Sequence, residues 1–428
     1  MIRIALLCIA LATAAPAADP AEDTATADDY GAIMEAAGGA MQRRDFPALV
    51  AYLDRAQRLH PWSLNVLKNR ILARQLAGRG DEAVALAAGI AEAGLALDLS
   101  GHPVLARVAE HPDYAPVAER MTANLEPVGV SRIVLEHDDP GLLPEAIAVE
   151  GGTTWIGSVR TGAILEFEAG AEPRRLATLP GGVFDLEVRD DRIWAAVSNA
   201  LAYRDAEGRP AQSPLAGIFM LDAATGEILE RGTLDEEAVL GDLEVGTDGT
   251  AWVSDSTTPR ILRWRPGMPA PEPFATDPRF VNLQGLALDE SRGALFVADY
   301  LAGLFRVDLA TGEATRLAHP EDAFLGGIDG RRLAGERQLI GIQNGTTPRR
   351  IVCLELDDEA TAAESLQVAA RALPEWNEPT HGDLVDGRLV YIATSNWPSY
   401  DEDFEESDES TLEPLRIMRL DSKEACKV

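Results

Sequence analysis

Hydrophobic and polar residues follow two different rhythms along the chain. From Asp28 to Met121, apolar positions recur every three to four residues in an Ala- and Leu-rich background, which is the spacing of amphipathic helices. After Val130, short apolar runs alternate with Gly, Asp and Pro, which is typical of strands joined by turns. The pattern predicts a small all-α domain over 28–123 and a mainly β domain over 130–422.

The helical segment divides into two hairpins of similar length. The first pairs residues 30–41 with 46–59, and the second pairs 63–76 with 82–94. Asp45 and Asp81 stand before the two second helices and lie 81 − 45 = 36 residues apart, close to the period of about 34 in tetratricopeptide repeats. The segment therefore resembles a short tetratricopeptide module. Two interpretations stay open, a groove that docks a protein partner and a helical prop for the second domain.

The β region repeats one structural unit six times. In each unit a buried strand is followed by a Gly/Asp turn and then by a strand carrying a large apolar residue, namely Trp155, Trp194, Trp252, Phe296, Ile340 and Tyr391. The intervals of 39, 58, 44, 44 and 51 residues leave room for about four strands per unit. The sequence thus predicts a six-bladed β-propeller. We expect Ser131 to Leu135 to close the ring as the outer strand of the last blade, because closure removes an exposed sheet edge.

Features at the chain ends and the overall charge limit the setting and the partners. Residues 1–17 have the apolar run Ile4 to Leu11 and the small-residue site Ala15 to Ala17 of a secretory signal peptide, so we expect an exported protein, periplasmic or secreted. In an oxidising compartment Cys353 and Cys426 can form a disulfide, and two unpaired thiols are the alternative. The net charge of −32 argues against nucleic acid and membrane surfaces as partners, because phosphate binding needs clustered Lys and Arg.

A polar residue stands just ahead of each inner strand, where the blades of a propeller converge on the central channel. In chain order these residues are Glu145, Asp185, Asp242, Gln284, Asp329 and the pair Thr380 and His381. Converging carboxylates raise one another's pKa values unless a cation neutralises them. Calcium meets this need because it takes about six to eight oxygen ligands, whereas a single His without Cys disfavours zinc. The pattern predicts a site for Ca²⁺ or another hard divalent cation.

Three of these segments resemble the axial motifs of the senescence marker protein/gluconolactonase-like six-bladed propellers. They are residues 144–149 with Glu145, 284–289 with Gln284, and 327–330 with Asp329. The resemblance covers roughly residues 130–422. It implies a divalent metal, usually calcium, on a Glu, an Asn and an Asp, so Glu145, Gln284 and Asp329 would be the metal ligands. Gln284 stands where the family has Asn, and the family's second, substrate-side Asn has no match here.

The resemblance implies an exported, calcium-dependent hydrolase that acts on a lactone or related ester in the central channel. Asp329 would be the general base, and His381 is the second candidate because its pKa suits neutral pH. Asp185, Asp242 and Thr380 would position water or the small-molecule substrate. The competing hypothesis is a non-enzymatic scaffold or ligand-binding propeller, with a structural metal and a helical module that docks a protein partner. In that case the channel carboxylates would bind backbone amides.

Overall fold

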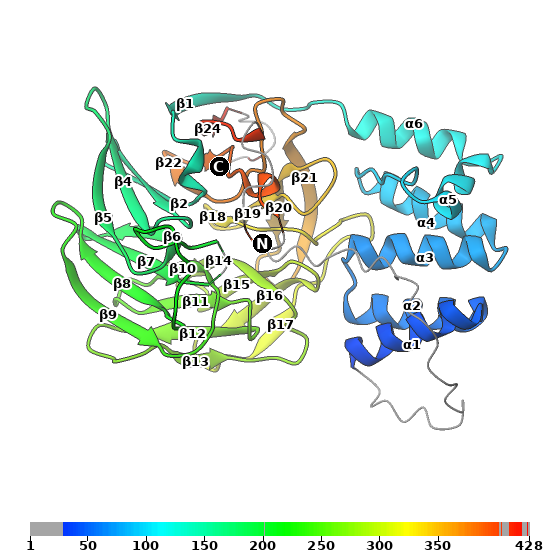
Figure 1. The fold of residues 1–428 in the computed structure, drawn as a ribbon, viewed down its shortest axis with the longest axis horizontal. Helices are drawn as coiled ribbons and strands as arrows, with labels where there is room; N and C mark the ends of the chain where they lie inside the picture. The colour runs from blue at the N-terminus through cyan, green and yellow to red at the C-terminus, as the bar shows by residue number, and fades with distance from the viewer. Residues whose placement is uncertain (1–28, 201, 402–403, 405–410, 422–425, 427–428) are drawn as a thin grey trace. The chain divides into compact units, whose positions relative to one another are not determined.

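The computed structural model of the chain contains a helical unit and a β unit, which divide between Leu125 and Glu126 (Figure 1). The residues that it describes are 29–200, 202–401, 404, 411–421 and 426. The predicted signal peptide, residues 1–17, lies outside them. No helix in the described part of the chain is long and apolar enough to cross a membrane.

The helical unit begins with two helix pairs. Its elements are α1 (Tyr30–Arg43), α2 (Phe46–Leu59), α3 (Leu64–Leu76), α4 (Gly80–Glu92), α5 (Pro103–Ala106), the 3₁₀ helix η1 (Arg107–Glu110) and α6 (Ala115–Asn124). Asp29, Asp45 and Ser63 cap α1, α2 and α3 by accepting hydrogen bonds from backbone N–H groups of the first turn. The first four helices follow the predicted hairpins, but Asp81, expected before the fourth helix, lies in the first turn of α4. The tetratricopeptide assignment stays a prediction.

The β unit is a propeller of six four-stranded antiparallel sheets, as predicted. Blade one is β2 (Pro144–Glu150), β3 (Thr153–Ser158), β4 (Ala163–Glu168) and β5 (Arg174–Thr178); blade two is β6 (Gly182–Arg189), β7 (Arg192–Ser198), β8 (Ala216–Asp222) and β9 (Ile228–Leu234). Blade three is β10 (Leu240–Val245), β11 (Ala251–Asp255), β12 (Arg260–Trp264) and β13 (Glu272–Ala275). Blade four is β14 (Leu283–Asp289), β15 (Ala294–Asp299), β16 (Gly303–Asp308) and β17 (Ala314–Arg316). Blade five is β18 (Arg331–Ala334), β19 (Gln338–Gln343), β20 (Arg350–Leu356) and β21 (Ala363–Arg371).

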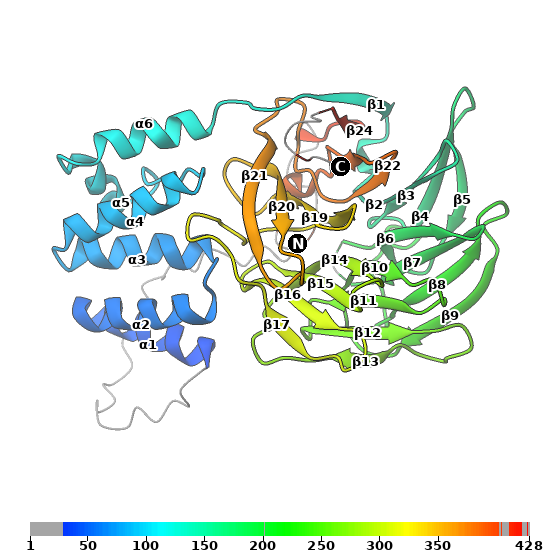
Figure 2. The ribbon, with the colours of Figure 1, turned by 180° about the vertical axis from the view of Figure 1, so that it is seen from behind.

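The sixth blade joins strands from both ends of the propeller. It has the order β22 (Gly382–Val385), β23 (Arg388–Ile392), β24 (Leu415–Leu420) and β1 (Ser131–His137). β1 runs antiparallel to β24, from the pair Ser131 and Leu420 to the pair His137 and Leu415, and the two strands lie side by side in both views (Figures 1 and 2). The predicted closure of the ring by residues 131–135 is confirmed, with the strand extending two residues further.

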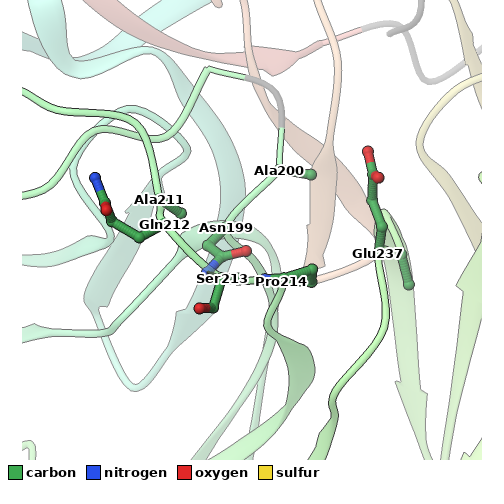
Figure 3. A pocket seen from close by; sticks show the side chains of 8 residues that line it. Asn199, Ala200, Ala211, Gln212, Ser213, Pro214 and Glu237 are labelled. Carbon is green, nitrogen blue, oxygen red and sulfur yellow. Dashed lines mark hydrogen bonds between the residues drawn. The ribbon is translucent and has the colours of Figure 1, made fainter.

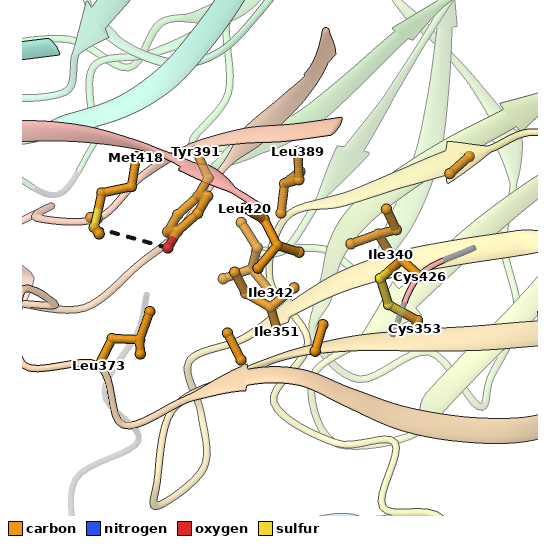
Figure 4. Packing of buried hydrophobic residues seen from close by; sticks show 14 residues of the cluster. Ile340, Ile342, Ile351, Cys353, Leu373, Leu389, Tyr391, Met418, Leu420 and Cys426 are labelled. Atoms are coloured by element: carbon orange, nitrogen blue, oxygen red, sulfur yellow. Dashed lines mark hydrogen bonds between the residues drawn. A yellow bond between two sulfur atoms is a disulfide. The ribbon is translucent and has the colours of Figure 1, made fainter. Parts of the chain in front are cut away.

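The core lies between neighbouring blades. The six large residues that marked the repeat all fall on the second strand of their blade and are buried. In the cluster between blades five and six, Ile340 and Ile351 pack with Tyr391 and Met418 (Figure 4). Cys353 of β20 is bonded to Cys426 beside this cluster, with the Cα atoms 5.7 Å apart. The structure therefore selects the disulfide over two free thiols, and the bond joins Cys426 to blade five.

Candidate functional site

A β-bulge at the start of several inner strands places the candidate residues. The pairing register shifts between Pro144 and Ala146 in β2, between Leu240 and Leu243 in β10, and between Leu283 and Leu286 in β14. Glu145, Asp242 and Gln284 stand at these shifts, inside the inner strands and not ahead of them as the sequence analysis expected. A bulge sets two residues of one strand against one of its partner and re-aims a side chain, so these polar groups leave the regular alternation of the strand.

Asp185 and Asp242 tie each blade to the next. Asp185 accepts the N–H of Leu186 at Oδ1 and the N–H of Leu243, in the following blade, at Oδ2, both at 2.8 Å. Asp242 Oδ2 accepts the N–H of Leu286 in blade four at 2.9 Å. Both carboxylates are fully buried. They carry the backbone-amide role that was the alternative to positioning water or substrate.

Two further carboxylates, which the sequence analysis did not single out, make the same kind of contact. Glu187 Oε2 accepts the N–H of Val245 at 2.6 Å, and Asp383 Oδ2 accepts the N–H of Val149 at 2.8 Å. Glu187 and Asp383 each stand two residues after a candidate residue. Because side chains alternate along a strand, that spacing returns them to the same face and was the signal that could have found them.

His381 is paired with Asp242 across the ring. Its Nε2 hydrogen-bonds to Asp242 Oδ1, and its Nδ1 lies 3.6 Å from Glu145 Oε1. Burial favours the neutral imidazole, but the carboxylates of Asp242, Glu145 and Asp185 together raise the pKa of His381 well above its ordinary value. Burial likewise acts against the charged carboxylate, yet the His381 charge lowers the pKa of Asp242. The two groups form an imidazolium–carboxylate pair at neutral pH, so His381 would have to lose that proton to serve as a base.

Asp329 is held by side chains instead of backbone amides. Asn344 Nδ2 donates to Asp329 Oδ2 at 2.5 Å, and the Tyr300 hydroxyl donates to Asn344 Oδ1 at 3.1 Å. The carboxyl group of Asp329 is buried, with 1% of the residue exposed. Burial and then the negative charge of Glu145 raise the pKa of Asp329 to about 7, although the His381 charge opposes them. The result is a buried carboxyl group that titrates near neutral pH.

Glu145 is fixed by a side chain from the last blade. The indole Nε1 of Trp397, in the 3₁₀ helix η3 (Trp397–Ser399) between β23 and β24, donates to Glu145 Oε2 at 2.6 Å. Its other oxygen faces His381. One oxygen of Glu145 therefore accepts the Trp397 hydrogen bond, and the negative charge of the carboxylate acts on both His381 and Asp329.

Gln284 and Thr380, also predicted for this site, are placed differently. Gln284 Nε2 donates to Asn282 Oδ1 at 2.7 Å, and no hydrogen bond in the described part of the chain joins Gln284 to Glu145 or Asp329. Thr380 is buried, and its Oγ1 has no hydrogen-bond partner among the described residues. The structure thus links Glu145, Asp242 and His381 by contact and Asp329 by charge, while Gln284 and Thr380 are not tied to them.

Arg332, on the inner strand of blade five, is a cation that the sequence analysis missed. Its guanidinium nitrogens lie 3.7 Å from Asp185 Oδ1 and 3.9 Å from Glu244 Oε1. Burial raises the pKa of Asp185 to about 6, against the opposing charge of Arg332. Burial and then Glu187 raise the pKa of Glu244 well above its usual range. Arg332 thus places a positive charge beside a second group of carboxylates, which includes Asp185 and Glu244.

These contacts bear on the predicted calcium site. Calcium was expected because converging carboxylates need a cation, and here His381 and Arg332 supply positive charge. The Trp397 and Asn344 hydrogen bonds occupy one oxygen each of Glu145 and Asp329. Among the residues that the structure describes, no group of three or more His, Cys, Asp or Glu is arranged to hold a metal ion. As arranged, the donor set does not fit calcium, and the calcium site expected from the sequence is untested.

A separate pocket of about 200 Å³ lies beside the connection between β7 and β8 (Figure 3). Its lining residues are Asn199, Ala200, Ala211, Gln212, Ser213, Pro214, Glu237 and Ala238. Asn199 pins this connection by donating to the Ser213 carbonyl at 2.8 Å and accepting the Leu215 N–H at 2.9 Å. None of the predicted site residues lines this pocket.

Comparison with known proteins gives fold neighbours only. No protein-family model matches the sequence, and a comparison with curated proteins finds no match. Among solved structures, the PQQ-bound aldose sugar dehydrogenase of Streptomyces coelicolor is 15% identical to this chain, with a TM-score of 0.46. The match spans 68% of this chain and 98% of the dehydrogenase. A glucose dehydrogenase is 13% identical with a TM-score of 0.47 (68% and 99% covered), and virginiamycin B lyase from Staphylococcus aureus is 13% identical with a TM-score of 0.46 (68% and 100% covered). The activities named belong to those proteins.

Proposed function

We propose that the propeller hydrolyses a small lactone or ester with Asp329 as the general base. The observation that carries the proposal is the Asp329 carboxyl group, which is buried, held through one oxygen by Asn344, and raised by burial and Glu145 to a pKa of about 7. A general base works best when its pKa lies near the working pH. No hydrogen bond from the described residues reaches Oδ1, the oxygen that would take the proton from water.

The protonated His381 complements this base. As water attacks the carbonyl carbon and gives its proton to Asp329, negative charge develops on the carbonyl oxygen. A fixed positive charge in a buried site stabilises that oxyanion far more than it would in water. The tetrahedral intermediate then collapses, the ester C–O bond breaks, and the leaving alkoxide takes the proton back from Asp329. No step is assigned to calcium, because the donor set does not fit the ion.

Hydrolysis of γ- and δ-lactones and of aryl esters by the purified protein tests the proposal, with and without added calcium. The Asp329→Asn variant removes the base and nearly preserves the shape of the side chain. Asp386→Asn is the matched control, since Asp386 is exposed at the left-handed turn between β22 and β23, a conformation that Asn adopts readily. Wild-type activity in Asp329→Asn, or no hydrolysis of any substrate, would overturn the proposal.

A non-enzymatic scaffold or ligand-binding propeller is the second candidate. The observation in its favour is the use of Asp185, Asp242, Glu187 and Asp383 as ties between blades. In this case the helical unit would dock a protein partner. A partner captured from an extract of the source cells by the full chain, and lost when only the exposed helical residues are changed, would support this candidate if the hydrolysis screen is negative.

The proposed setting is an exported, periplasmic or secreted one. The bond between Cys353 and Cys426 supports it, because structural disulfides persist in oxidising compartments. Fractionation of cells that express the full chain, followed by thiol labelling of each fraction, tests this. A cytoplasmic protein with two labelled thiols would contradict it.

A further inference from the structure

We infer that Asn344 and Tyr300 are positioning residues that fix the Asp329 carboxylate in its working orientation. The inference rests on the proposed hydrolase function. Asn344 Nδ2 donates to Asp329 Oδ2 at 2.5 Å, and Tyr300 donates to Asn344 Oδ1 at 3.1 Å. Because the amide oxygen is occupied by the Tyr300 hydroxyl, the amide nitrogen is the end that must face Asp329.

The two residues occupy the same place in adjacent blades. Tyr300 directly follows β15, the second strand of blade four, and Asn344 directly follows β19, the second strand of blade five. They are 344 − 300 = 44 residues apart, which equals the spacing of the repeat between these two blades. The contact therefore runs between two equivalent loop positions, and it reaches the residue ahead of the inner strand of blade five.

Backbone hydrogen bonds connect the segments that contain Tyr300, Asp329 and Asn344. The N–H of Gly327 donates to the Tyr300 carbonyl at 2.8 Å, and the N–H of Gly345 donates to the Gly327 carbonyl at 3.1 Å. The N–H of Asp329 donates to the Ile342 carbonyl at 2.8 Å. These bonds hold the residues on either side of Asn344 and of Asp329, so the amide and the carboxylate meet without free rotation of the loops.

Gly345 and Gln343 complete this frame. A Cβ atom on Gly345 would lie 2.4 Å from the Tyr300 hydroxyl, so only glycine lets the ring approach Asn344. Gln343 donates from Nε2 to the carbonyls of Phe324 and Gly326, at 2.8 and 2.7 Å. Gln343 and Gly345, which flank Asn344, thus both help to hold the loop in place.

A neutral amide suits the role of holding a base. Among the residues that the structure describes, the charged groups that act on Asp329 from other elements include Glu145, His381 and Asp242. A cationic side chain in place of Asn344 would favour the carboxylate and make it a weaker base, whereas the amide fixes its direction with a single hydrogen bond. The arrangement orients Asp329 and leaves its other oxygen without a hydrogen bond from the described residues.

The test compares Asn344→Ala and Tyr300→Phe with Asn199→Ala. Asn199 occupies the equivalent position after β7, and its hydrogen bonds to described residues lie within its own connection, so its loss controls for loop damage. We expect kcat to fall about 100-fold in Asn344→Ala and about tenfold in Tyr300→Phe, because a misplaced catalytic group costs about that much. KM should stay within about twofold of wild type, and Asn199→Ala should keep the wild-type kcat. The double variant should be no worse than Asn344→Ala, since Tyr300 acts through Asn344.

The outcomes separate this inference from the proposed function. If Asp329→Asn is inactive while Asn344→Ala keeps the wild-type kcat, the positioning inference is wrong and the base assignment stands. If the wild type hydrolyses nothing, crystal structures of the wild type and Asn344→Ala decide the positioning role alone. A turned Asp329 carboxylate in the variant supports the inference, and an unchanged one overturns it.

Discussion

Asp242, at the bulge near the start of β10, and Asp329, two residues ahead of β18, both lie where an inner strand begins, yet their charges are stabilised in opposite ways. Asp242 gives one oxygen to a backbone N–H of the next blade and the other to His381. Asp329 has Asn344 on one oxygen and the negative charge of Glu145 nearby. The His381 charge lowers the pKa of Asp242 against burial, whereas burial and Glu145 raise that of Asp329 to about 7.

The difference shows that the position of a carboxylate in the channel does not by itself decide whether it has a structural or a catalytic role. A carboxylate saturated by backbone amides and an imidazolium is stabilised in its charged form and contributes to the assembly of the ring. A carboxylate crowded by a second one is destabilised in that form, which is the condition of a group kept for proton transfer. Four measurements test this contrast.

The largest expected effect is on catalysis. Replacing Asp329 by Asn should lower kcat/KM by about 10²- to 10⁴-fold, the range for loss of a general base. Steady-state kinetics on the best lactone or ester from the screen would measure it. A variant with wild-type kcat/KM would place Asp329 with Asp242 among the structural carboxylates.

The second effect is on stability at Asp242. Asp242→Asn should lower the free energy of unfolding by about 3 kcal/mol near neutral pH, because it leaves His381 without its buried partner. Denaturant unfolding would measure it. The folded-state pKa of Asp242 is lowered, so its stabilisation is present above the ordinary value of about 3.9 and is lost as the pH falls through the lowered value. A loss that does not shrink in acid would contradict the ion pair.

The third effect has the opposite sign. Asp329→Asn should raise the free energy of unfolding at pH 8, by at most about 4 kcal/mol, because a pKa raised to about 7 means that the folded state resists the charge. The folded protein holds this proton more tightly than the unfolded chain, so wild-type stability falls as the pH rises from about 4 to 7. Thermal unfolding measured across that range should show the Tm of the variant rising relative to that of the wild type as the pH increases. Parallel curves would mean that Asp329 is not strained.

The smallest effect concerns calcium. Since His381 and Arg332 already supply cations, a millimolar excess of calcium over chelator should leave the Tm of the wild type unchanged within about 1 °C. A calcium-dependent rise in Tm that disappears in Glu145→Gln would instead restore the predicted metal site. Magnesium at the same ionic strength is the control.

The architecture was readable from the sequence because each blade repeats the same signals. The spacing of Trp155, Trp194 and Trp252 located second strands, and the leftover extended run before Glu145 located the closing strand β1. Such signals are local in the chain, and because the unit occurs six times, a weak signal in one blade is supported by the others. The helix pairs were readable for a similar reason, since Asp45 and Ser63 mark helix starts.

The site was only partly readable, because the contacts that define it join residues far apart in the chain. Sequence position brought Asp242 and His381 to one ring but did not show that they pair across 139 residues. The sequence predicted a hard divalent cation for these carboxylates, and it did not show Arg332 as a charge partner of Asp185, because nothing local in the sequence marks that contact. Asn344 and Tyr300 escaped notice since they follow second strands, outside the slots ahead of the inner strands.

The pairing of β1 with β24 also sets an order of events during synthesis. β1 is made before the other described strands of the propeller, and its partner in the sheet, β24, is the last of them. The sixth blade therefore stays incomplete until β24 has emerged, whereas the helices pack mainly on helices close to them in the sequence, such as α1 on α2 and α3 on α4. Helices with such local contacts form quickly, so the helical unit can be folded while the ring is still open.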